Sequence, residues 1–595
     1  MEGSVISSIF FMVSFGLVYA GAFRLQKSEK PLNGVVWVMM DFLTVLCWGA
    51  FCAGLINMVR IPVNIVSMGL VYLVSGAALF YKAQRDGETQ KYQWNRYDFL
   101  YVALVGGAVF ALLAARITPR LDFVFNNSDA AVHLRNSLTI VRTGNLDTMY
   151  FAPLHNALVT EVFLPLIRKT DTYKVFLVVD GAAFVLEAVF FMALIREYLQ
   201  KTILKGLGIL IGFAYVFGYP MHSYLFSFFY WGICVMLIGY ALLMLREYSA
   251  GKLKENITIF CLMACCASIT MCYMLFGPVS YVAVFLCLCI NFQKRGTLFS
   301  WNTVKISLQV FLLPCILSVY YCYFMFLKKQ GLSVGGTLGL QGAIYGELFI
   351  NFIWLTPFVL YMLVRSLKEK HLDGAMVFFL CFSGMVLAMG GLAVAGKASQ
   401  YYYFKFYYPV WMLGFVVLAQ GVSKLYEESR DFLVAGILMV VFVAAISATK
   451  LETKTQARGI GWGDHTSELF GIYYYNASSY QLRLKPFNKD LLDASNYIME
   501  EFGKDENVPM ISTLPNYVQC YWYEALTGED SSEYYGWDYG MGEIKRKLKN
   551  QEVEHFIVGK FFKVYKKNKR FFKKFNWVYE NKTVFVAETK PKVCK

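Results

Sequence analysis

Apolar segments of about 15–25 residues recur along the first 450 residues of this chain, and they constrain its fold more than any other feature. A helix needs about 20 mostly apolar residues to cross a bilayer, and fourteen segments meet or approach that length. Only 16% of the residues are charged and 57% are hydrophobic, so a soluble fold could not cover this apolar surface. We therefore predict a polytopic α-helical membrane protein. The predicted spans are 5–23, 34–58, 61–81, 98–115, 174–195, 207–221, 227–245, 256–273, 278–292, 306–327, 346–364, 374–395, 407–422 and 431–449.

The distribution of Lys and Arg between the loops predicts the orientation of the chain. One set of alternate loops, including 24–30 and 82–96, holds most of the loop cations, and the positive-inside rule places these loops in the cytoplasm. Both termini, the loop 116–173 and the tail after residue 450 are then extracytoplasmic, which predicts a multi-pass protein of the plasma membrane. The net charge of +15 is largely this orientation signal, so a nucleic-acid partner is excluded.

Four regions follow from this topology. Residues 1–115 form the N-terminal spans, 116–173 a long extracytoplasmic first loop, 174–449 the remaining transmembrane core, and 450–595 an extracytoplasmic domain. The loop is far longer than a connection between two helices requires, so it needs a function of its own.

The tail has the pattern of a small α/β domain. Helical and strand-like stretches alternate, which favours a partly parallel sheet, and a hairpin closes the chain. No Gly-rich phosphate loop is present, so nucleotide binding is not expected. The predicted helices are 489–503, 515–526 and 541–550, and the predicted strands are 508–512, 556–559, 577–580 and 584–587.

Within the long loop, apolar residues at helical spacing predict an amphipathic surface helix over 130–142. Asp129 precedes this helix and Gly144 follows it, as start and stop signals do. Asp129 is therefore either the N-cap residue of the helix or a catalytic carboxylate. Both interpretations are open at this point.

The run from Asp129 through Arg135 to Gly144 resembles the first external loop of the GT-C superfamily, with the spacing of the oligosaccharyltransferase catalytic subunit. Members of this superfamily are membrane glycosyltransferases that use polyprenyl-phosphate-linked sugars. The resemblance implies a GT-C-like fold and transfer of a sugar to an envelope glycan, lipid or protein. It also implies that Asp129 is the general base, since a carboxylate can activate an acceptor hydroxyl.

A polyprenyl-phosphate donor also requires positive charge near its phosphate, because negative charge develops there as the sugar leaves. Lys397 and Lys405 flank a tyrosine-rich external segment and are the first candidates, although Tyr and Lys also gather in ordinary interfacial belts. Arg116, Arg120 and Arg135 in the first loop are further candidates. The residues expected to line the substrate site are His133, His155, Tyr402 and Tyr403.

Other acidic residues divide into three groups. Glu347 resembles the loop acid that supports the oligosaccharyltransferase site, with a helix N-terminal role as the alternative. Asp180 and Glu187 lie inside one span, where they are expected to pair with a cation or a tyrosine. The second external loop, 219–223, lacks the paired acids of the family, so no cofactor is expected and a divalent metal, although possible, has no support. The run 537–540 matches an acceptor-reading motif by chance in our interpretation.

Two other functions remain as alternatives to catalysis. The first is a transporter or flippase of a lipid-linked glycan, although the sequence has neither an internal repeat nor matching Gly/Pro-broken spans. The second is a membrane scaffold that displays the tail, which leaves the long first loop without a purpose.

Overall fold

The computed structural model describes most of the chain. The described residues are 4–25, 32–86, 92–117, 121, 125, 127–146, 154–329, 331, 333–339, 348–442, 470–479, 489–503, 506–513, 517–536 and 540–591. Among these residues, thirteen helical stretches are long and apolar enough to cross a membrane. Residues 430–442 are also helical, but the fourteenth predicted span, 431–449, extends beyond the described residues. The predicted polytopic α-helical architecture is confirmed.

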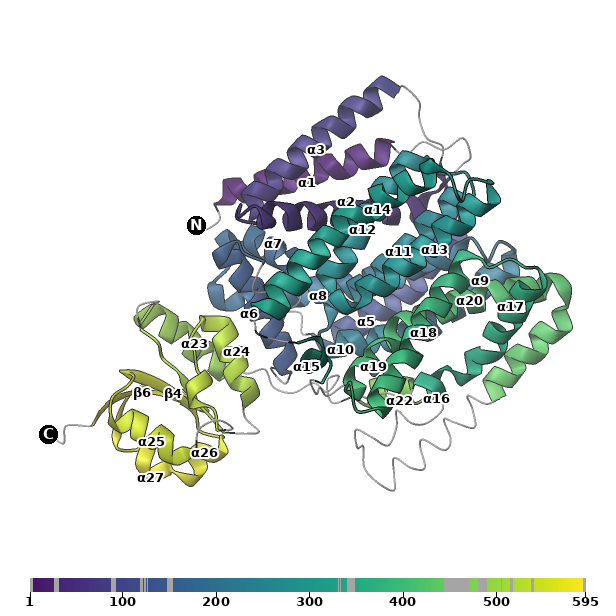
Figure 1. Ribbon diagram of the computed structural model, residues 1–595. Helices are drawn as coiled ribbons and strands as arrows, with labels where there is room; N and C mark the ends of the chain where they lie inside the picture. Colours follow the sequence, from purple (N-terminus) through teal and green to yellow (C-terminus); the bar gives the residue numbers. More distant parts are fainter. Residues whose placement is uncertain are drawn as a thin grey trace.

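The thirteen stretches form one bundle (Figure 1). Helices α11 and α20 are buried along nearly their whole length, whereas α1 and α3 pack on each other at the edge and expose most of their apolar side chains. Such an exposed apolar surface suits contact with lipid. The stretches comprise α1 (Val5–Leu25), α2 (Gly34–Met58), α3 (Ile65–Asp86), α4 (Arg96–Tyr101) with α5 (Gly107–Arg116), α8 (Thr172–Arg196), α9 (Thr202–Val216) with α10 (Tyr219–Leu225), α11 (Phe229–Ser249), α12 (Glu255–Cys272), α13 (Gly277–Lys294), α14 (Trp301–Ser318), α16 (Leu348–Phe352) with α17 (Thr356–Lys368), α18 (Gly374–Val394), and α19 (Gln400–Lys405) with α20 (Tyr407–Glu428).

Short elements gather at the end of the bundle nearest the C-terminal domain (Figure 1). They include α6 (Ser128–Thr143), α10, α15 (Val334–Leu338), α19 and α22 (Gly471–Ser478). The predicted helix of the first loop is therefore present as α6. It is not an open helix on a membrane surface, because it packs against α7 (Leu154–Phe163) and a helix of the C-terminal domain.

The C-terminal domain has a four-stranded mixed sheet in the order β3-β4-β6-β5. β3 is parallel to β4, and the remaining pairs are antiparallel, as the predicted partly parallel sheet with a closing hairpin requires. Helices α23 and α24 lie on the side of the sheet toward the bundle, and α25–α27 lie on the far side (Figure 1). The bounds are α23 (Lys489–Glu501), β3 (Met510–Ile511), α24 (Tyr517–Thr527), α25 (Met541–Lys549), β4 (His555–Gly559), α26 (Lys563–Lys567), α27 (Lys569–Phe572), β5 (Phe575–Glu580) and β6 (Val584–Pro591).

Helix α24 joins this domain to the first loop. The indole Nε1 of Trp522 donates a hydrogen bond to the backbone carbonyl of Asn127 at 3.0 Å, and its ring stacks on Phe125 with the centroids 4.4 Å apart. Arg135 on α6 forms an ion pair with Glu524 at 2.9 Å. The tail is thus held directly against the residues that begin α6.

Candidate functional site

The local structure of α6 separates the two interpretations of Asp129. Asn127 is the N-cap residue, because its backbone is extended and its side chain accepts a hydrogen bond from the backbone N–H of Asp129 at 2.9 Å. The N-cap interpretation of Asp129 is therefore wrong, and its carboxylate is not used to start the helix. Gly144 ends α6 with a φ of 63°, a left-handed conformation that favours glycine.

Asp129 on α6 and Lys405 on α19 lie at the same end of the bundle (Figure 1). The Asp129 side chain is exposed, yet the protein around it removes enough solvation to raise the pKa of its carboxyl group. The positive charge of Lys405 acts in the opposite direction and lowers that pKa. The two residues, 276 positions apart in the sequence, are therefore close enough for each charge to act on the other.

Lys405 lies in a cage of aromatic rings. Its side chain is buried, with 1% of the residue exposed, and Nζ is 3.8 Å from the ring centroid of Tyr401. The rings of Trp231, Tyr273 and Tyr402 lie 5.0, 5.1 and 5.2 Å from the same atom. No described carboxylate forms an ion pair with this ammonium group, so its charge is balanced by ring faces and by the more distant Asp129. A buried cation of this kind can stabilise an anionic ligand.

His133 lies one helical turn after Asp129 and therefore on the same face of α6. Burial and then the charge of Lys405 lower the pKa of its imidazole to about 3, so it is neutral at physiological pH. Its ring packs edge-on against Tyr230, with the centroids 4.8 Å apart. The neutral imidazole of His133 can donate or accept a hydrogen bond on the same face of α6 as Asp129, and it adds no positive charge there.

Two of the predicted phosphate-binding arginines have other partners. Arg135 is six residues after Asp129, about 120° away around the helix, and it binds Glu524 of α24. Arg116 is buried and donates to the backbone carbonyls of Tyr224 and Leu225 at 3.1 and 3.2 Å. Arg135 therefore joins α6 to α24, and Arg116 joins α5 to the end of α10.

The other predicted site residues are placed as follows. Tyr402 is part of the Lys405 cage. Tyr403 is not part of the cage, and its ring packs edge-on against that of Tyr407. Lys397 is exposed after the end of α18. His155 is half-buried in α7, where burial lowers the pKa of its imidazole to about 4, and no interaction among the described residues joins it to Asp129. Residues outside the described part of the chain are Arg120, Glu347 and 537–539.

Of the two buried acids of α8, Glu187 has a partner of the expected kind. Glu187 accepts a hydrogen bond from the hydroxyl of Tyr215 at 2.8 Å, and the charge of Arg116 acts on Asp180. The hydrogen bond of Glu187 joins α8 to α9, whereas Asp180 forms no hydrogen bond with any described residue.

Sequence reasoning missed the cage residues Trp231 and Tyr273, whereas Tyr401 lies in the tyrosine-rich segment that it singled out. Trp231 lies in the first turn of α11, and Tyr273 directly follows α12. Their signal was an aromatic residue at the end of a span, which is also the pattern of an interfacial belt.

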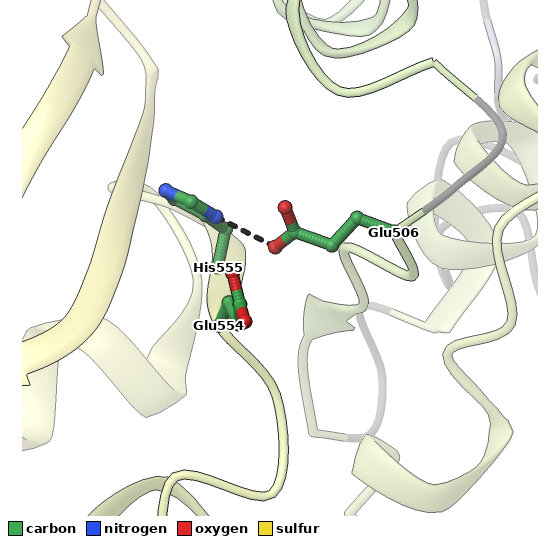
Figure 2. Close-up of side chains that lie close together, drawn as sticks. All are labelled: Glu506, Glu554 and His555. Atoms are coloured by element: carbon green, nitrogen blue, oxygen red, sulfur yellow. Dashed lines mark hydrogen bonds and ion pairs between the residues drawn. The ribbon is translucent and has the colours of Figure 1, made fainter.

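A possible metal site lies elsewhere. In the part of the chain that the structure describes, one cluster has metal-compatible geometry: Glu506, Glu554 and His555, with ligand atoms within 4.8 Å of one another (Figure 2). His555 Nδ1 is 2.6 Å from Glu506 Oε1, and the cluster belongs to the C-terminal domain. No described cluster of this kind includes Asp129.

No protein-family model matches the sequence, and no curated protein matches it. Among solved structures, the chain is similar to ArnT from Cupriavidus metallidurans bound to undecaprenyl phosphate. The similarity covers 84% of this chain and 98% of that chain, with a TM-score of 0.49 and 10% sequence identity. A similarity this low does not assign a function, so the function must be argued from the chemistry of the site.

Proposed function

We propose that the protein is a membrane glycosyltransferase that moves a sugar from a polyprenyl-phosphate carrier to an acceptor of the cell envelope. The observation that carries this proposal is the aromatic cage around Lys405, which lies at the same end of the bundle as Asp129 and within electrostatic reach of its carboxylate. An exposed carboxylate and a caged ammonium group supply the two charges that the reaction needs. The spacing of Asp129, Arg135 and Gly144, which resembles the GT-C first loop, adds support from the sequence.

In the proposed reaction, Asp129 accepts a hydrogen bond from the acceptor hydroxyl and takes its proton as the oxygen attacks the anomeric carbon. The bond between that carbon and the phosphate oxygen breaks, and its electron pair remains on the polyprenyl phosphate. The raised pKa of Asp129 makes its carboxylate a stronger base than an ordinary aspartate.

Lys405 is the proposed partner of the departing phosphate. Negative charge grows on the phosphate in the transition state, and a preformed ammonium group with little water around it stabilises that charge strongly. The surrounding rings hold Nζ in position, so little reorganisation is needed when the donor binds. The neutral imidazole of His133 keeps the adjacent wall free of a second positive charge that would weaken the base.

The C-terminal domain has a positioning role in this proposal. Trp522 binds the carbonyl of Asn127, the residue whose side chain caps the helix that bears Asp129. Helix α24 thereby restrains the first turn of α6 at the position where the base must be held. The acceptor can be a glycan, a lipid or a protein, and the proposal does not depend on which.

Transfer by the purified protein tests the proposal. The protein in lipid nanodiscs is incubated with labelled polyprenyl-phosphate sugars and a mixture of envelope glycans, lipids and peptides. Asp129→Asn is expected to abolish transfer while leaving donor binding intact, because the carboxamide cannot accept the proton. Asp530→Asn, at an exposed position of the C-terminal domain, is the matched control and should remain active. Near-normal transfer by Asp129→Asn contradicts the assignment, and movement of intact donor across vesicles without transfer favours a flippase.

A further inference from the structure

A cavity of about 310 Å³ lies at the end of the bundle opposite Asp129. It is bounded by the last turns of α11 and α13 and by the first turn of α18. α11 begins directly after α10, at the end of the bundle where Asp129 lies, and its 21 residues span about 30 Å. The cavity therefore belongs to the other membrane face, and it has no part in the proposed transfer.

The guanidinium group of Arg246 is the main polar group of this cavity. It stacks over the ring of Tyr198 at 3.8 Å, and it makes neither a hydrogen bond nor an ion pair with any described residue. Its Nη1 atom is fully buried. A buried charged donor without an acceptor is costly, so a ligand that enters the cavity would gain by supplying the acceptor.

The neighbouring carboxylates are engaged elsewhere. Asp373 caps α18 by accepting a hydrogen bond from the backbone N–H of Met376 at 3.0 Å, and its second oxygen accepts from Gln420. Glu247, the next residue after Arg246, forms an ion pair with Lys252 at 3.1 Å. Neither acid forms a hydrogen bond or an ion pair with Arg246 among the described residues.

The rest of the lining favours an anion. Lys294 lies exposed at the end of α13, and the first residues of α18, Gly374 and Ala375, present the positive end of that helix. With Asp373 included, the lining has a net positive charge. The cavity opens among helix ends at a membrane face, and basic cavities between transmembrane helices suit the phosphates of lipid head groups.

We propose that this cavity binds the phosphate of an anionic phospholipid head group through Arg246, with Lys294 at its rim. The volume accommodates a phosphate and its glycerol, and the apolar side chains of Leu242, Leu245 and Ile290 continue the lining. The site joins α11, α13 and α18. This proposal is independent of the proposed glycosyltransferase activity.

Lipid binding by the full-length, delipidated protein tests the site. Native mass spectrometry and thermal unfolding are measured with phosphatidylglycerol, with phosphatidylcholine and with inorganic phosphate. Phosphatidylglycerol is expected to bind and raise the Tm more than the other two. Arg246→Gln should weaken its binding about tenfold or more, because it removes a charge-assisted interaction, and Arg246→Lys should retain part of it. Arg430→Gln removes an exposed cation outside the cavity and is the matched control.

Three results would overturn the proposal. The first is equal binding of phosphatidylglycerol by the wild type and by folded Arg246→Gln. The second is an equal loss in Arg430→Gln, which would indicate general attraction of acidic lipid to surface charge. The third is full saturation of the Tm shift by inorganic phosphate alone, which would replace the lipid by a free anion.

Discussion

Glu524 and Arg135 form one ion pair, but the structure predicts very different costs for removing its two members. The Glu524 side chain is 2% exposed, and besides Arg135 it accepts hydrogen bonds from the backbone N–H of Ser531 at 2.8 Å and from the hydroxyl of Tyr535. The Arg135 side chain is 46% exposed, so solvent screens its part of the pair. Loss of Glu524 removes an acceptor from two buried donors as well as from Arg135.

The magnitudes follow from this difference. Glu524→Ala leaves two buried donors of the C-terminal domain unsatisfied at about 1–3 kcal/mol each and also removes the ion pair to α6, so we expect α24 to be destabilised by about 3 kcal/mol. Arg135→Ala leaves Glu524 with its other two donors, and an ion pair this exposed contributes about 0.5–1 kcal/mol. We therefore predict that Glu524→Ala is several times more destabilising than Arg135→Ala, because Glu524 is buried and Arg135 is largely exposed.

Hydrogen–deuterium exchange in the full-length protein measures the local stability of α24. Glu524→Ala should lower the protection of α24 by about a hundredfold, and Arg135→Ala by less than about tenfold, because 1.4 kcal/mol corresponds to a factor of ten. Glu524→Gln, which keeps one carbonyl acceptor, should fall between them. Equal losses in the two alanine variants would refute the reasoning. If Arg135 instead binds the donor phosphate, Arg135→Ala should raise the donor KM while Glu524→Gln leaves it unchanged.

Three further predictions concern the site and α6. The acid limb of the pH profile should lie above the ordinary range for aspartate, because Asp129 must be ionised and its pKa is raised, and activity should fall as the pH falls through that pKa. Lys405→Met should raise the acid limb further by removing the charge that lowers this pKa, and should raise the donor KM about tenfold or more, whereas Lys397→Met should leave the acid limb unchanged. Gly144→Ala should destabilise the protein by about 1–3 kcal/mol in thermal unfolding, because the added Cβ would lie 2.8 Å from Pro62 and the backbone is left-handed. Gly251 has the same left-handed backbone, but no atom lies within 4 Å of its added Cβ, so Gly251→Ala should cost only about 1 kcal/mol.

Much of the fold could be predicted because it follows from local patterns. The length of each apolar segment predicts a span, and two strand-like runs separated by the short turn 581–583 predict the β5–β6 hairpin. Asn127 and Gly144 act within α6 itself, although the sequence pattern placed Asp129, and not Asn127, at the helix start. Local signals therefore predicted most of the elements and left some helix ends uncertain by a few residues.

The site was less predictable because its contacts join residues far apart in sequence. Lys405 and Asp129 were each predicted, but nothing local indicated that Trp231 and Tyr273 would surround the ammonium group. Helices in lipid are held together by shape and hydrogen bonds rather than by hydrophobicity, so their neighbours cannot be inferred from an apolar pattern. The binding of Arg135 by Glu524 has the same origin, since the partner lies 389 residues later in the chain.

The contact between Trp522 and Asn127 also bears on how the protein is made. The two residues are 395 positions apart, and Asn127 is synthesised and inserted long before α24 exists. The first turn of α6 therefore acquires its restraint from Trp522 only after α24 has been synthesised and has folded. A chain interrupted before α24 would carry Asp129 but would lack the helix that restrains the start of α6, so the proposed site would be fully held only once α24 has been made.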